Sequence, residues 1–81
     1  MKYVFTQTAE EHFNGLSAIY RRRIATKMRF FVSQRDPLQF AEPLTGPGEY
    51  RFRVGDYRIF FEVLNDIIWV NAIKRRDEAY R

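Results

Sequence analysis

The sequence predicts a single α+β domain in which a two-helix hairpin packs on one face of an antiparallel sheet. The chain has 81 residues, enough for one domain over residues 1–81 and too few for two. Its first half shows the helical spacing of apolar residues, and its second half shows the alternation of half-buried strands. A segment with all three prolines separates the halves. The expected order is therefore a strand, two helices and a three-stranded antiparallel meander.

The chain is expected to begin with a short strand over residues 2–6, in which Tyr3 and Phe5 share one face. Thr8 and Glu11 have the spacing of a capping box, which predicts that the first helix begins at Thr8. The apolar residues of this helix follow helical spacing: Ala9, Phe13 and Leu16.

A second helix is predicted over residues 18–34, with Ser17 as its N-cap. Its apolar residues recur every three or four positions: Tyr20, Ile24, Met28 and Phe31. The basic residues lie largely off that stripe, and no acidic residue occurs between His12 and Arg35. The basic outer face is either solvated or directed toward a partner, and both interpretations stay open.

Residues 37–49 are predicted to form a loop, because they contain all three prolines and two of the four glycines. Strands are then predicted over residues 50–54, 57–64 and 67–72. Gly55–Asp56 suits a type II′ turn between the first two strands, and Asn65–Asp66 forms a second tight turn.

A two-residue turn at Gly55–Asp56 fixes the pairing of its strands, so that Arg53 lies directly opposite Arg58. One face of the hairpin then belongs to the core: Tyr50, Phe52, Val54, Tyr57, Ile59, Phe61 and Val63. The other face gathers Arg51, Arg53 and Arg58. Like charges directly across a strand pair destabilise it by about 0.2–1 kcal/mol, so the arrangement indicates an anionic ligand.

The second turn extends this face, since it pairs residues 62 with 69, 60 with 71 and 58 with 73. The expected neighbours of the arginines are Phe60, Glu62, Trp69, Asn71 and Ile73. Arginines beside aromatic rings on a sheet suit a phosphodiester chain with unstacked bases. The alternative is that the arginines only solvate the exposed side of the sheet, with Trp69 as a sheet cover or a protein-interface anchor.

The composition excludes several kinds of site. The chain has no cysteine for disulfides or cysteine-based metal sites. Its one histidine, His12, is expected to be partly buried and to have a structural role. No apolar run approaches the roughly 20 residues of a membrane span, and the N-terminus is too soon polar for a signal peptide. A cytoplasmic protein with no membrane contact is expected. The net charge is +4, and most of the basic residues are arginines, which favours a nucleic-acid or acidic protein partner.

Residues 50–63, YRFRVGDYRIFFEV, resemble the signature of the RelE/ParE superfamily of bacterial and archaeal toxins. Residues 73–81, IKRRDEAYR, are similar to that family's basic-tyrosine ending. Length and element order also match, so the resemblance covers essentially the whole chain. It implies a RelE-like β-α-α-β-β-β fold and a toxin of a toxin–antitoxin pair.

In the RelE branch, the toxin enters the ribosomal A site and cleaves mRNA there by attack of a 2′-hydroxyl on the adjacent phosphate. The resemblance therefore implies a metal-independent endoribonuclease, an mRNA interferase that inhibits translation and needs no cofactor. One alternative is the ParE-like branch, which poisons DNA gyrase by protein–protein contact. Another is an inactive homologue that only binds its antitoxin. The three sheet arginines together with Tyr80 favour the ribonuclease.

The resemblance also implies roles for single residues. Arg51 and Arg53 match two basic positions of the first middle strand, and Arg58 matches an arginine that stabilises charge on phosphorane oxygens. Arg75 matches the basic residue of the tail, and Tyr80 matches the C-terminal tyrosine. The residues expected to contact RNA are Lys74, Phe60 and Trp69, and those expected to face the ribosome or the antitoxin are Arg21, Arg22, Arg23 and Lys27.

The chain departs from the family pattern at Arg51 and Arg53, where well-studied ribonucleases of the family carry lysines. Arginine binds phosphate, but it keeps its proton up to about pH 12 and is a poor general base. Proton transfer is therefore expected to fall to Tyr80, Lys74 or water. Glu62 is a further candidate, although an ion pair between Glu62 and a nearby arginine is the favoured interpretation. The expected partners are a cognate antitoxin with an acidic, partly disordered segment, the ribosome and mRNA.

Overall fold

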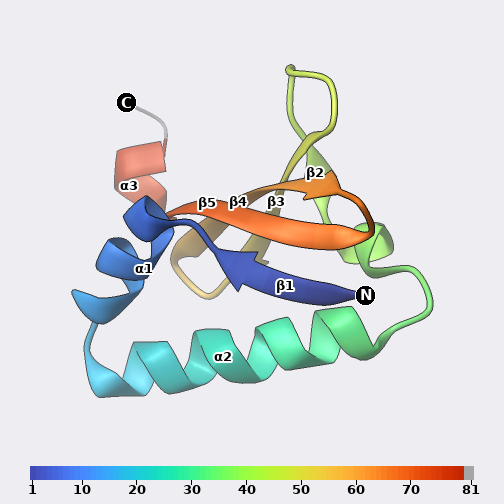
Figure 1. The fold of residues 1–81 in the computed structure, drawn as a ribbon. Helices are drawn as coiled ribbons and strands as arrows, with labels where there is room; N and C mark the ends of the chain where they lie inside the picture. The colour runs from blue at the N-terminus through green and yellow to red at the C-terminus, as the bar shows by residue number, and fades with distance from the viewer. Residues whose placement is uncertain (80–81) are drawn as a thin grey trace.

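A computed structural model describes residues 1–79 of the chain. In chain order the elements are β1 (Lys2–Phe5), α1 (Gln7–Asn14), α2 (Ala18–Ser33), the 3₁₀ turn η1 (Pro37–Phe40), β2 (Glu42–Pro43), β3 (Glu49–Val54), β4 (Tyr57–Leu64), β5 (Ile67–Arg75) and α3 (Arg76–Ala79). Figure 1 shows α2 running along one face of the sheet, with α1 and α3 near the end of β5. None of the helices within residues 1–79 is long and apolar enough to cross a membrane.

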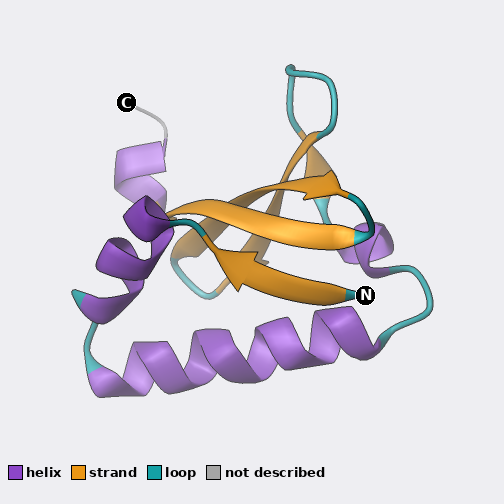
Figure 2. Cartoon of the chain, in the orientation of Figure 1, coloured by secondary structure: helices purple, strands orange, loops and turns teal. Residues whose placement is uncertain are grey.

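The five strands form one sheet in the order β1-β5-β4-β3-β2, drawn in orange in Figure 2. The strands β3, β4 and β5 form the antiparallel meander that the alternation predicts. The sheet as a whole is mixed, because β1 pairs in parallel with β5. A short strand that the sequence does not reveal, β2, adds to the free edge of β3. The predicted α+β class is confirmed, with a wider and mixed sheet.

The first helix begins at Gln7, so the predicted start at Thr8 was wrong. Thr6 is the N-cap, and its hydroxyl accepts a hydrogen bond from the Ala9 backbone N–H at 3.2 Å. The Thr6 N–H donates to the Val70 carbonyl at 2.9 Å, so the strand and the helix meet at this residue. Ser17 is the N-cap of α2 as predicted, although its side chain makes no capping hydrogen bond.

A stack of aromatic rings joins α2 to the sheet. The Phe31 and Phe52 ring centroids lie 4.1 Å apart, and those of Phe52 and Phe61 lie 4.4 Å apart. Both sheet rings are fully buried. Since large rings bury much apolar area each, the stack gives this small domain a dense core and confirms which face of the hairpin packs on the helices.

The two tight turns adopt the conformations that their sequences favour. At Gly55–Asp56 only Gly55 has a positive φ, +58°, which agrees with a type II′ turn. At Asn65–Asp66 both residues have positive φ, as a type I′ turn requires. Because two-residue turns set strand register, these residues determine which side chains meet on the sheet.

Candidate functional site

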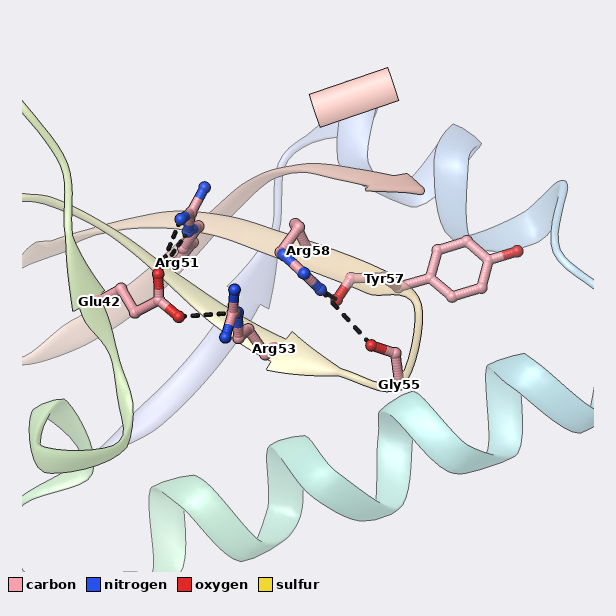
Figure 3. A network of polar contacts seen from close by, with 6 residues as sticks. All are labelled: Glu42, Arg51, Arg53, Gly55, Tyr57 and Arg58. Atoms are coloured by element: carbon pink, nitrogen blue, oxygen red, sulfur yellow. Dashed lines mark hydrogen bonds and ion pairs between the residues drawn. The ribbon is translucent and has the colours of Figure 1, made fainter. Parts of the chain in front are cut away.

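The sheet face away from α2 carries the predicted arginine cluster. Arg53 lies directly opposite Arg58, and Arg51 lies opposite Phe60, as the turn at Gly55 predicts. Figure 3 shows Arg51, Arg53 and Arg58 side by side on the two strands. The register of this hairpin is therefore confirmed.

A carboxylate that the sequence did not point to joins two of these arginines. Glu42 on β2 accepts hydrogen bonds from Nε and Nη2 of Arg51, at 3.0 and 2.7 Å, and its other oxygen lies 2.8 Å from Nε of Arg53. The Arg51 hydrogen bond, together with the positive charges of Arg51, Arg53 and Arg58, lowers the pKa of the Glu42 carboxyl. Glu42 is therefore ionised at neutral pH and forms a bridge between Arg51 and Arg53 (Figure 3).

Arg58 is in a different position, because it is buried. The residue is 4% exposed, whereas the side chain of Arg53 is 55% exposed. The Arg58 Nη1 donates long hydrogen bonds to the carbonyls of Tyr57 and Gly55, at 3.3 and 3.4 Å. The Arg58 Nε has no hydrogen-bond partner. Among the side chains that the structure describes, those of residues 1–77, no carboxylate lies at ion-pair distance from Arg58. A buried cation with no counter-ion at ion-pair distance is costly, so this position is suited to an anion.

A β-bulge corrects the predicted register of the second hairpin. The pairing shifts between Phe60 and Phe61, so Arg58 faces Lys74 and not Ile73. Ile73 lies opposite Ile59 in the core and is 4% exposed, so its placement beside the arginines was wrong. The expected pairing of residues 60 and 71 was also wrong, because Phe60 faces Ala72.

The bulge has a chemical consequence, because it aligns three cationic residues across the sheet. Arg53, Arg58 and Lys74 occupy directly paired positions on β3, β4 and β5. Directly paired residues project from the same face. Lys74, one of the residues expected to contact RNA, therefore joins the arginine cluster.

Arg75 lies on the opposite side of the sheet from Lys74. It pairs with Tyr57, a core residue, so it projects toward the helix side at the end of β5. Its side chain is 62% exposed, and its Nε lies 3.8 Å from a carboxylate oxygen of Asp77. Tyr80 lies outside the described residues. The catalytic roles expected of Arg75 and Tyr80 stay predictions.

We call the sheet face that carries Arg51, Arg53 and Arg58 the arginine face. Its aromatic end holds Phe60 and Trp69. Phe60 is partly buried, and Trp69 is 37% exposed and lies opposite Glu62, as predicted. Glu62 accepts a hydrogen bond from the Asn71 amide at 2.9 Å. Among the described residues Glu62 has no arginine at ion-pair distance, so the expected Glu62–arginine pair was wrong. The carboxylate that pairs with the sheet arginines is Glu42.

The remaining predicted residues lie on the helices. The Arg21 Nη1 donates to the Leu16 carbonyl, which holds this arginine against the loop before α2. Arg22, Arg23 and Lys27 are exposed on α2. His12 is partly buried, and its Nδ1 accepts the Ile73 backbone N–H at 3.2 Å, which links α1 to β5.

The comparisons with known proteins agree on one superfamily. A family model described as the ParE toxin of the type II toxin–antitoxin system parDE matches residues 3–80. No curated protein matches the chain. Among solved structures, a chain of the RelBE2 toxin–antitoxin complex from Mycobacterium tuberculosis has a TM-score of 0.78 and 22% identity, over 93% of this chain and 96% of that one.

Two further structures share the fold. A chain of the RelB–RelE complex from Methanococcus jannaschii has a TM-score of 0.76 and 24% identity, over 95% of this chain and 94% of that one. A chain of the chromosomal ParDE system from P. aeruginosa has a TM-score of 0.59 and 19% identity, over 93% and 95%. At these identities the likeness concerns the fold, whereas the family model covers nearly the whole sequence. The chain is therefore a type II toxin of the ParE toxin family, within the RelE/ParE superfamily.

Proposed function

We propose that this toxin is an endoribonuclease that cleaves mRNA in the ribosomal A site and thereby stops translation. The observation that carries the proposal is Arg58, a buried cation with an unpartnered Nε, placed between Arg53 and Lys74. A phosphate group would supply the negative charge and the hydrogen-bond acceptors that this position lacks. RNA is the substrate class that fits best, because it has a phosphate at every nucleotide and, unlike DNA, a 2′-hydroxyl beside it.

The proposed reaction is a transesterification, in which one P–O bond replaces another. The 2′-hydroxyl oxygen attacks the adjacent phosphorus, a P–O2′ bond forms, and the P–O5′ bond breaks. The products are a 2′,3′-cyclic phosphate and a free 5′-hydroxyl. Negative charge builds up on the non-bridging oxygens in the transition state, and Arg58 stabilises it from a position fixed by the carbonyls of Tyr57 and Gly55.

Glu42 is the carboxylate best placed to accept the 2′-hydroxyl proton. It is ionised, and it contacts both Arg51 and Arg53. An incoming phosphate competes with Glu42 for these arginines, and a carboxylate released from them becomes a stronger base. Lys74, across from Arg58, is the donor for the leaving 5′-oxygen. The exposed ring of Trp69 lies on the same face for base stacking.

We also infer that a cognate antitoxin neutralises the toxin. Related toxin folds occur in solved complexes with antitoxins, among them RelBE2 from M. tuberculosis and RelB–RelE from M. jannaschii. An acidic antitoxin segment that reaches the arginine face would compete with RNA for Arg53 and Arg58.

Purified ribosomes programmed with a defined mRNA test the proposal. Wild-type protein should produce cuts within the A-site codon, with 5′-hydroxyl ends that polynucleotide kinase can label. Arg58→Met should abolish the cuts, and Arg29→Met, which removes an exposed arginine of α2, should keep them. Full cleavage by Arg58→Met would show that the site assignment is wrong.

A second candidate function is a ParE-like toxin that acts on DNA gyrase by protein contact. The matching family model is that of ParE, and Glu42 already pairs with two of the three sheet arginines. This function requires no phosphate at Arg58. It predicts intact mRNA, inhibited gyrase and an Arg58→Met variant with unchanged toxicity.

A further inference from the structure

We infer that the outer face of α2 is a docking surface for an acidic amphipathic helix of a partner protein. This face lies on the side of α2 away from the sheet, and Figure 1 shows no described element covering it. It is therefore separate from the arginine face. We call it the α2 outer face and define it by Ile19, Arg22, Arg23, Thr26, Lys27 and Phe30.

The shape of the surface fits a helix. Two rows of side chains run along α2 at four-residue spacing, Ile19–Arg23–Lys27 and Arg22–Thr26–Phe30. A groove lies between them and is lined by Ile19, Arg22, Arg23, Thr26 and Lys27. Rows at this spacing form the ridges and grooves through which helices pack against each other. Thr26, the small residue at the centre, allows a partner ridge to approach closely.

The ends of the surface are apolar and exposed. Ile19 is 66% exposed at one end, and Phe30 is 45% exposed at the other. Phe40 from η1 is 40% exposed and packs edge-on against Phe30, with ring centroids 5.3 Å apart, which widens that end. Phe30 lies eleven positions after Ile19 along the helix, a distance of about 16 Å. A partner helix of three to four turns spans both apolar ends.

The middle of the surface is cationic. Arg22, Arg23 and Lys27 flank the groove, and α2 contains no acidic residue. The Lys27 Nζ lies 5.8 Å from the Phe30 ring centroid, and the Arg23 Cζ lies 5.5 Å from the Tyr20 ring centroid. These cation–π contacts hold the two charged groups beside the groove. The complementary helix has acidic residues at its centre and apolar residues near both ends.

Other occupants fit less well. A second copy of this chain would place Arg22, Arg23 and Lys27 against the same cations, which is repulsive. An RNA backbone would pair with the cations but would leave Ile19 exposed, because an aliphatic side chain neither pairs with phosphate nor stacks on a base. The apolar ends and the cationic centre together favour the acidic helix.

The test measures binding of a fluorescent 18-residue amphipathic peptide to the full chain by anisotropy. The peptide carries leucines near both ends of one face and glutamates between them, and a scrambled peptide of the same composition is the reference. We expect the ordered peptide to bind more tightly than the scrambled one. Arg22→Glu with Lys27→Glu should weaken that binding by at least about tenfold, and Ile19→Ser should weaken it by about fivefold.

A matched control reverses two cations elsewhere. Lys2→Glu with Arg76→Glu changes the net charge by the same amount at exposed positions on β1 and α3, and it should change the affinity by less than about twofold. Circular dichroism checks that each variant keeps its helix content. The proposal fails if the ordered peptide does not bind, if the scrambled peptide binds equally well, or if the control pair weakens binding as much. It also fails if the α2 variants release a single-stranded RNA oligomer or an anionic vesicle but not the peptide.

Discussion

Replacement of Arg58 by methionine separates the cost of the buried cation from its use. Methionine is unbranched and apolar like the stem of arginine, and it is shorter, so it fits the same position without a charge. The residue is 4% exposed, and its Nε has no partner. If the position is prepared for a phosphate, the variant should be more stable than wild type and inactive in mRNA cleavage.

The expected gain follows from the contacts of Arg58. A buried polar group without a partner costs about 1–3 kcal/mol, and a charged one costs more. The directly paired Arg53 and Lys74 each add about 0.2–1 kcal/mol of like-charge repulsion. Against this, the variant loses two hydrogen bonds of 3.3 and 3.4 Å, each at the weak end of about 0.5–1.5 kcal/mol. These terms leave a gain of about 0.5–4 kcal/mol. The expected value is about 1–2 kcal/mol, because methionine is shorter than arginine and fills the position less completely.

Thermal unfolding followed by circular dichroism measures this gain. For a domain of this size 1 kcal/mol shifts Tm by about 4–8 °C, so Arg58→Met should melt several degrees above wild type. Arg53→Met is the matched control, because that side chain is 55% exposed and pairs with Glu42, and its Tm should change by only a few degrees. A Tm for Arg58→Met several degrees below wild type would refute the reasoning, because it would show that the fold itself satisfies the guanidinium.

Three other perturbations test separate parts of the structure. The pKa of Glu42 is lowered in the folded state. The stabilisation from the ionised carboxylate is therefore complete above about pH 4.3, the pKa of an unfolded glutamate, and it is lost as the pH falls through the lower pKa of the folded state. The stability difference between wild type and Glu42→Gln should accordingly shrink in acid, in urea titrations at several pH values. His12→Leu removes the acceptor of the Ile73 N–H, which should cost about 1–2 kcal/mol and speed hydrogen exchange at that amide. Gly55→Ala places a Cβ at φ +58° and should destabilise the fold by about 1–2 kcal/mol in the same urea titrations.

Each of these has a clear contrary result. A Glu42→Gln difference that stays constant across the acid range would mean that the ionised carboxylate adds nothing through Arg51 and Arg53. Unchanged exchange at Ile73 in His12→Leu would show that the imidazole is not its acceptor. Full stability of Gly55→Ala would contradict the type II′ turn, and Gly15→Ala, at a helix C-cap with negative φ, gives the reference for a tolerated change.

The sequence predicted the parts of the fold that local rules control. The turn at Gly55–Asp56 determined the β3–β4 register, and the alternation of residues 50–64 identified the core face. The strand β2 could not be predicted, because two residues within a proline-rich loop have no periodicity. The helix start was ambiguous because two threonines, at positions 6 and 8, are both suited to an N-cap. The structure selects Thr6, whose hydroxyl caps the helix and whose N–H is bonded to Val70, and it places Thr8 within α1.

The candidate site was predicted in outline. Alternation assigned Arg51, Arg53 and Arg58 to one face, but it says nothing of depth, so the burial of Arg58 came only from the structure. The bulge after Phe60 leaves one extra residue on β5, between Val70 and Ala72, and no sequence pattern predicts it. It places Lys74 beside the arginines in place of Ile73. Glu42 was missed because its contacts depend on β2, and an acidic residue in the loop was the only available sign.

Ribosome profiling with mapping of new 5′ ends, after brief induction of the toxin in cells, tests the central claim most directly. Wild type should yield 5′-hydroxyl ends within the A-site codons of ribosome-bound mRNA, and Arg58→Met, although folded, should yield none. Growth arrest with intact mRNA and double-strand breaks in DNA, in both wild type and Arg58→Met, would contradict the account.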